Sequence, residues 1–149
     1  MYKQILVPLE EGRDSWRSLD HARELAAQLG AALVLLRVIT VFPAGHEFDR
    51  RLQIEAGSSG ARAKAAAETE LGQLEQDLRV RGVGASTAIV ISEEPVARVI
   101  VTYAETNQCD LIVMPTQARS AIGRWLFGSV GEKVRRRSQV PVLFVPETR

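Results

Sequence analysis

The stretch from Asp110 to Val145 reads DLIVMPTQARSAIGRWLFGSVGEKVRRRSQVPVLFV and decides the fold class. Its first apolar run, residues 111–114, is typical of a short strand buried on both faces of a parallel sheet. A loop of small and polar residues follows, Gly128-Ser129 then begins a predicted helix, and a second apolar run, 142–145, closes the unit. Strand, loop, glycine and helix N-terminus is the arrangement by which α/β proteins present backbone N–H groups to a phosphate.

The rest of the chain repeats the same alternation of short apolar runs and helical spacing. Further strands are predicted at 4–8, 33–39 and 88–91, with helices that begin near Asp14, Ser58 and Pro95. Gly30 and Gly82 are expected to end the first two helices, and residues 41–57 are expected to be an irregular loop. The order βαβαβαβαβ predicts one α/β domain over 1–149, an open five-stranded parallel sheet with helices on both faces.

Composition agrees with a single ordinary domain. The chain has 149 residues, of which 46% are hydrophobic and 25% charged, and its net charge is +1. No apolar run approaches the roughly 20 residues of a membrane helix, and the N-terminal residues are not expected to form a signal peptide. The single cysteine, Cys109, excludes an intramolecular disulfide. We therefore expect a cytoplasmic protein that does not enter the membrane.

Positive charge gathers on the segment that follows the fourth strand. Residues 119–137 carry six basic side chains against the single Glu132, while the rest of the chain is net acidic. Two interpretations stay open: a solvated helix end, where cations are favoured, or contacts from Arg119 and Arg124 to an anion. Nucleic-acid binding is not expected, because the net charge is small and no aromatic residues alternate with the basic ones.

Four segments resemble the universal stress protein family in their order and spacing. They are ILVPLEEG at 5–12, LAAQLGAALVLLRVI at 25–39, EEPVARVIVTYAETNQCDLIVM at 93–114 and GSVGEKVRRRSQVPVLFVP at 128–146. The resemblance implies a Rossmann-like five-stranded sheet, a role in the stress response and a homodimer formed through the last strand, Val142–Val145. It also implies that ATP is a possible ligand, because some members bind it and others do not.

The family members that bind ATP share a sequence pattern of Gly, two residues, Gly, nine residues, Gly, then Ser or Thr. Placing Gly128-Ser129 at its end puts Pro115 and Ala118 where the first two glycines would be. Proline fixes φ near about −65° and has no N–H to donate, whereas alanine adds only a methyl group. In the members that bind ATP an aspartate contacts the nucleoside where this chain has Glu10, and Val38 either matches an apolar residue near the base or is a core valine.

The candidate binding residues come from three strand ends and the loop before the last helix. They are Pro8, Leu9, Glu10, Val38, Met114, Pro115, Ala118, Arg119, Arg124, Gly128, Ser129 and Val130. The sequence favours a non-catalytic dimeric stress protein that binds ATP weakly or not at all. The alternative is a nucleotide-binding regulatory protein in which Arg119, Arg124 and the Gly128-Ser129 helix start hold the phosphates.

Catalysis and metal binding are not expected. The sequence has no P-loop, no nucleophile elbow and no Cys-x-x-Cys, so a slow ATP hydrolase is the least favoured hypothesis. His21 lies on a predicted helix, and His46 lies in the predicted loop near two acidic residues, which is poor support for a metal site. Cys109, just before a buried strand, is expected to behave as a small apolar residue.

Overall fold

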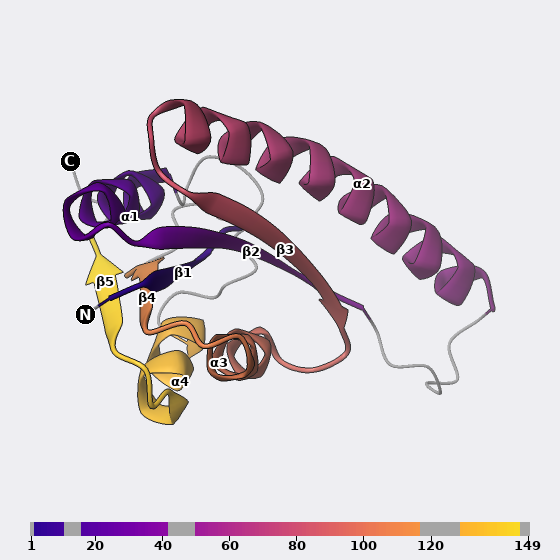
Figure 1. Cartoon of the computed structure of the whole chain (residues 1–149). Helices are drawn as coiled ribbons and strands as arrows, with labels where there is room; N and C mark the ends of the chain where they lie inside the picture. Colours follow the sequence, from indigo (N-terminus) through magenta and orange to yellow (C-terminus); the bar gives the residue numbers. More distant parts are fainter. Residues whose placement is uncertain (1, 11–15, 42–49, 117–128, 147–149) are drawn as a thin grey trace.

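The structure is a computed structural model that describes residues 2–10, 16–41, 50–116 and 129–146. Strands and helices alternate along these described residues (Figure 1). They are β1 (Gln4–Pro8), α1 (Trp16–Leu29), β2 (Ala32–Thr40), α2 (Arg50–Val80), β3 (Ala85–Ser92), α3 (Val96–Thr106), β4 (Leu111–Pro115), α4 (Ser129–Arg137) and β5 (Val142–Val145).

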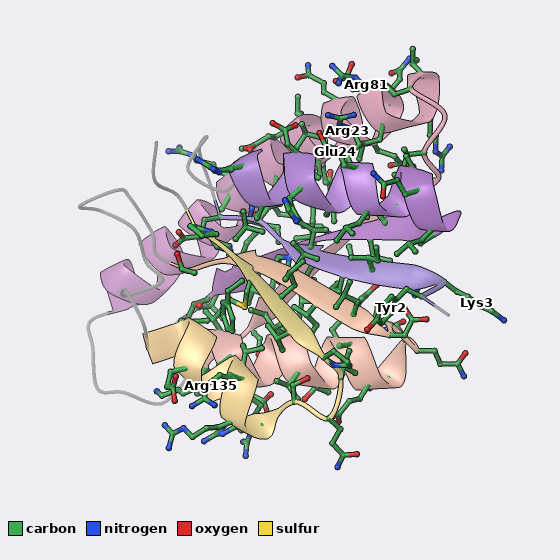
Figure 2. The ribbon with its side chains drawn as sticks, turned by 90° about the vertical axis from the view of Figure 1, so that its left-hand side faces the viewer. Tyr2, Lys3, Arg23, Glu24, Arg81 and Arg135 are labelled. Carbon is green, nitrogen blue, oxygen red and sulfur yellow. The ribbon has the colours of Figure 1, made fainter. Side chains whose placement is uncertain are left out.

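The strands form one parallel sheet in the order β3-β2-β1-β4-β5. Helices α1 and α2 cover one face, and α3 and α4 cover the other (Figure 1 and, turned by 90°, Figure 2). This confirms the predicted α/β class and the open five-stranded parallel sheet. Burial on both faces is the reason that the strands read as unbroken apolar runs rather than as alternating patterns.

Side chains of the central strands alternate between two hydrophobic cores. In β2, Leu33 and Leu35 pack beneath α1 and α2, while Val34 and Leu36 pack against α3 and α4. A fully buried leucine or isoleucine contributes about 1.5–3 kcal/mol relative to an exposed one. The two cores therefore supply the main favourable contribution to the free energy of folding, and they hold the strand ends in fixed positions.

Glycines end the helices where the sequence predicts. Gly30 follows α1 with φ +68°, and Gly82 follows α2 with φ +85°. Both values lie in the left-handed region, which glycine adopts without the strain that a Cβ would cause. Pro95, with φ −57°, directly precedes α3, as expected of a proline at a helix start.

The predicted boundary between the 41–57 loop and the long helix is wrong. Helix α2 begins at Arg50 and continues through the Gly-Ser-Ser-Gly segment at 57–60 that resembles a helix start. Gly60 is buried beside β2, where a Cβ would lie 3.7 Å from Cγ1 of Val41. A Cβ at this distance would make an ordinary van der Waals contact, and residues 42–49 of the predicted loop lie outside the described ranges.

The amino ends of β1 and β4 are joined by one carboxylate. Asp110 accepts hydrogen bonds from the backbone N–H groups of Lys3 at 2.8 Å and Gln4 at 3.2 Å, and its own N–H donates to the carbonyl of Gln4. These bonds set the register of the two strands at the end opposite to the candidate site. Among the helices that the structure describes, none is long and apolar enough to cross a membrane.

Candidate functional site at the carboxyl edge of the sheet

The strand order switches direction between β1 and β4. From β1 the chain proceeds outward to β2 and β3, and it later returns to β4 and β5 on the other side of β1. Pairing of β1 with β2 extends from Gln4 to Pro8, but pairing with β4 is confined to Ile5 and Leu6. Parallel α/β sheets bind ligands beyond the carboxyl ends of the strands at such a switch point.

Pro8 and Pro115 are the last residues of the two strands that flank the switch point. Backbone groups of a parallel strand alternate between its two neighbours. Because Leu9 N–H donates to β2, the nitrogen of Pro8 is on the β4 side, and because Thr116 N–H donates to Val145 of β5, the nitrogen of Pro115 is on the β1 side. Two donor positions that face the switch point therefore carry no N–H group.

The structure corrects the predicted end of β4. The sequence predicts a strand over residues 111–114, whereas Pro115 is its last residue and pairs with Val145. A proline is tolerated within a sheet where its nitrogen faces no ladder partner. Pro115 meets this condition, since the β1–β4 pairing has already ended at Leu6 and Ile112.

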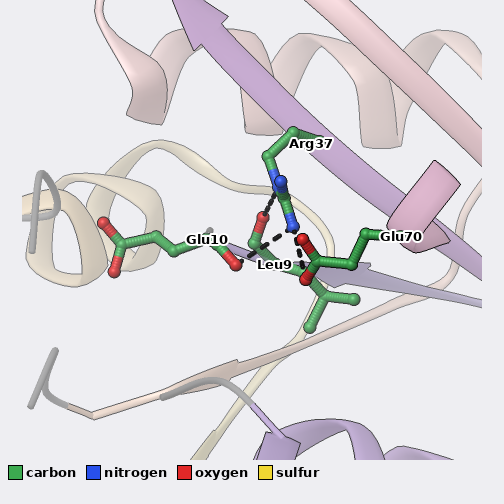
Figure 3. Close-up of polar contacts among 4 residues, drawn as sticks. All are labelled: Leu9, Glu10, Arg37 and Glu70. Atoms are coloured by element: carbon green, nitrogen blue, oxygen red, sulfur yellow. Dashed lines mark hydrogen bonds and ion pairs between the residues drawn. The ribbon is translucent and has the colours of Figure 1, made fainter. Parts of the chain in front are cut away.

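Leu9 and Glu10 continue from β1 into the candidate site. Leu9 is buried in the core beneath α1 and α2, and its N–H donates to the carbonyl of Leu36 at 2.8 Å. Glu10 is half-buried, and Figure 3 shows its carboxylate extending away from Arg37 and Glu70. The structure therefore places the Glu10 acceptor group at the carboxyl edge, as the sequence predicts.

Val38 and Met114 contribute mainly to the core. Met114 is fully buried, and Val38 is half-buried; both belong to the core beneath α3 and α4. Helix α4 begins at Ser129, and Val130 packs against the same core. In a parallel βαβ unit the helix starts at the carboxyl edge of the sheet, so the N-terminus of α4 belongs to the same edge as Glu10 and Pro115.

Part of the predicted site lies outside the described residues. This part consists of Ala118, Arg119, Arg124 and Gly128. The described residues of the site are therefore the ends of β1, β2 and β4 and the first turn of α4.

A buried arginine that the sequence analysis did not identify lies beside this edge. Arg37 of β2 is 6% exposed, and its Nε donates to the carbonyl of Leu9 at 2.6 Å. Its Nη2 donates to the carbonyl of Glu10 at 3.1 Å and to Oε1 of Glu70 in α2 at 3.2 Å (Figure 3). The available signal was a charged residue within the apolar run VLLRVI, because buried charges require partners.

The histidines and the cysteine that the sequence analysis considered lie apart from this edge or outside the described residues. His21 is exposed on α1, and His46 lies outside those ranges. Cys109 is buried, which raises the pKa of its thiol, and Gln4 Nε2 lies 3.5 Å from its Sγ. Among the side chains that the structure describes, no three of His, Cys, Asp or Glu group as metal ligands would.

The sheet order defines the class of protein: a doubly wound α/β protein whose topological switch point lies between β1 and β4. The model of the universal stress protein family matches residues 1–146. The chain belongs to the universal stress protein family.

Individual relatives agree with this assignment. The universal stress protein MJ0531 of Methanocaldococcus jannaschii is 28% identical over 152 aligned residues, which cover 97% of this chain and 82% of the relative. The structure of UspA from Lactobacillus plantarum has the same fold, with a TM-score of 0.80, 20% identity and 97% coverage of both chains.

Two further structures with this fold hold adenine nucleotides. A universal stress protein in complex with cAMP has a TM-score of 0.63 and 21% identity, and the match covers 99% of this chain and 98% of the other. The universal stress protein of Archaeoglobus fulgidus in complex with dAMP has a TM-score of 0.61 and 18% identity, with 96% and 97% of the chains covered.

Proposed function

We propose that this chain is a cytoplasmic, non-catalytic universal stress protein that acts in the stress response as a homodimer and binds ATP weakly or not at all. Membership of the family is the starting point. The observation that carries the proposal is the pair of prolines, Pro8 and Pro115, whose nitrogens face the switch point without an N–H to donate.

The missing donors matter because phosphates bind at such edges mainly through backbone N–H groups. The first turn of α4 still offers N–H groups, and a helix N-terminus favours a negative charge by about 0.3–1 kcal/mol when exposed. A micromolar complex requires about 8 kcal/mol. The helix start alone therefore supports weak binding of an anion rather than tight binding of a nucleotide.

The alternative is a nucleotide-binding regulatory protein that uses Arg119, Arg124 and the Gly128-Ser129 helix start. The family relatives that hold cAMP and dAMP support this alternative, as does the acidic Glu10 at the edge. Charge-assisted hydrogen bonds from two arginines to phosphate would offset part of the lost backbone contacts. A function without catalysis is proposed in either case, since the sequence has no P-loop and no nucleophile elbow.

The homodimer is proposed to form through β5. This strand lies at one edge of the sheet, and its odd-numbered residues face β4, as the bonds to the carbonyls of Pro141 and Val145 require. The backbone groups of Val142 and Phe144 therefore face the open edge. Their side chains are half-buried, and an apolar edge strand of this kind is a template for pairing with a second copy.

Isothermal titration of the purified protein with Mg-ATP tests the proposal, after a check for co-purified nucleotide. We expect a dissociation constant weaker than micromolar or no measurable heat. The variant Pro115→Gly/Ala118→Gly restores the glycine pattern and is expected to bind ATP more tightly than the wild-type protein. Micromolar or tighter binding by the wild type supports the regulatory alternative, and no improvement in the variant contradicts the assigned defect.

A further inference from the structure

The buried guanidinium of Arg37 contacts two consecutive carbonyl groups directly after β1. In an extended strand, consecutive carbonyls point to opposite sides. Arg37 nevertheless donates hydrogen bonds to the carbonyls of both Leu9 and Glu10, at 2.6 and 3.1 Å. The backbone therefore departs from strand geometry at this point, and Arg37 fixes the direction in which Glu10 leaves the sheet.

The same guanidinium connects this turn to the long helix α2. Its Nη2 lies 3.2 Å from Oε1 of Glu70, and the two side chains are 8% and 31% exposed. A buried arginine without a counter-charge is strongly unfavourable, so Glu70 stabilises the position of the guanidinium. The planar fork of arginine suits several acceptors at fixed angles, which a lysine would not match.

We infer that Arg37 is a positioning residue of the switch-point site, which sets the orientation of Glu10 and couples it to α2 through Glu70. The inference rests on the proposed function in one respect: the ligand that Glu10 meets is taken to be the nucleoside part of an adenine nucleotide. Arg37 itself acts through the Leu9–Glu10 backbone and does not contact the ligand. A shift in the position of α2 then changes the affinity of the site for its ligand, and binding of the ligand changes the position of α2 by the same coupling free energy.

The chain contains a matched control for this arrangement. Arg79 also spans α2 and a strand: its Nε and Nη2 donate to the carbonyl of Ala85 at 3.2 and 2.9 Å, and its Nη2 lies 2.7 Å from Oε1 of Glu75. Ala85 is the first residue of β3, so Arg79 lies at the opposite end of the sheet from the candidate site. The Arg79 side chain is 62% exposed, so its replacement is expected to disturb the protein less than replacement of Arg37.

The first test measures amide hydrogen exchange in the protein without nucleotide. In Arg37→Met, exchange of the Leu9 amide is expected to accelerate on the order of tenfold, because the turn that follows this last β1–β2 bond loses two charge-assisted contacts. In Arg79→Met it is expected to be unchanged. If Arg37→Met fails to fold, Glu70→Ala replaces it, with Glu75→Ala as its control. Unchanged Leu9 exchange in the Arg37 or Glu70 variant overturns the inference.

The second test measures affinity for ATP and AMP, in the wild type or in Pro115→Gly/Ala118→Gly, whichever binds. Glu70→Ala is expected to weaken both nucleotides by a similar factor, on the order of tenfold, whereas Glu75→Ala does not. In a Glu10→Ala background the Glu70 effect is expected to disappear, because it acts through Glu10. A purely structural role would leave the effect intact in that background and overturns the inference. If neither protein binds ATP, the account of the phosphate defect fails, while hydrogen exchange still decides the role of Arg37.

Discussion

The nitrogens of Pro8 and Pro115 face one another's strands across the point where the sheet changes direction. Each proline ends its strand, each is buried, and neither nitrogen carries a hydrogen. The relationship follows from the outward bonds of their neighbours, Leu9 to Leu36 and Thr116 to Val145. The β1–β4 ladder ends at Leu6 and Ile112, before it reaches either proline, and a proline nitrogen has no hydrogen with which to extend it.

Replacement of Pro115 by alanine is expected to destabilise the free protein, on the premise that the new N–H, beyond the end of the β1–β4 ladder, finds no acceptor. A buried donor without a partner costs about 1–3 kcal/mol, to which the loss of proline's restriction of the unfolded chain adds about 0.4–1 kcal/mol. The control is Pro95→Ala, an exposed proline before α3, which loses only the smaller contribution. Urea denaturation measures both. Equal losses of stability in the two variants would mean that the nitrogen of Pro115 does not face an unpaired position. If Mg-ATP raises the urea midpoint of Pro115→Ala more than that of the wild type, an anion accepts a hydrogen bond from the new N–H.

The open edge of β5 gives a prediction for the dimer. Val142→Pro removes an N–H that faces away from β4, so the ladder within one subunit is retained while pairing with a second copy loses a bond. Val142→Ala keeps that N–H and serves as the control. Sedimentation at micromolar concentration is expected to give dimers for the wild type and Val142→Ala, and a shift toward monomers for Val142→Pro. A monomeric wild type would contradict the proposed homodimer.

The sequence predicts the alternation of elements because each strand is covered on both faces and each helix ends at a recognisable residue. Gly30 and Gly82 have the positive φ angles that a helix end requires, and Pro95 directly precedes α3. The early start of α2 was not predictable in this way. Gly57 and Gly60 resemble a helix boundary locally, yet the helix continues through both, and Gly60 is buried within it.

The sequence did not predict those contacts of the site that join residues far apart in the chain. Glu10 and Pro115 were found because each lies at the carboxyl end of a predicted strand, and a parallel topology brings strand ends together. Arg37 was missed because its partners are 28 residues away at Leu9 and 33 residues away at Glu70. A local pattern contains a charged residue in an apolar strand but not the identity of its acceptors, which depend on the register of β1 and on the position of α2.

Two helical glycines are expected to respond differently to the same substitution. Gly72 is exposed in α2 and a Cβ there meets nothing within 4 Å, so Gly72→Ala is expected to stabilise the protein by about 0.5–1 kcal/mol. At Gly131 in α4, a Cβ would lie 3.1 Å from Cε1 of Phe144. Gly131→Ala is therefore expected to give no stabilisation in urea denaturation. Combination with Phe144→Leu provides the check, since removal of the ring should restore the benefit of alanine; equal stabilisation at both glycines would contradict the close approach to β5.

The buried thiol of Cys109 predicts a loss of stability at alkaline pH. Burial is the main reason that the pKa of this thiol is raised, with the charge of Asp110 adding to the effect and the Gln4 hydrogen bond opposing it. In the unfolded chain a cysteine thiol has a pKa of about 8.5. Below that value both states hold the proton and the contribution is fully present; above it the unfolded state releases a proton that the folded state retains, so the free energy of unfolding falls as pH rises toward the folded pKa.

The difference in free energy of unfolding between the wild type and Cys109→Ala isolates this contribution from other titrations. Urea denaturation under reducing conditions is expected to give a constant difference from about pH 6 to 8 and a decline of the wild type relative to the variant above about pH 8.5. The pKa of Tyr103 is also raised, by burial and by Cys109, so its ionisation follows at higher pH. A difference that stays constant up to about pH 10 would mean that the Cys109 thiol ionises as readily in the folded protein as in the unfolded chain.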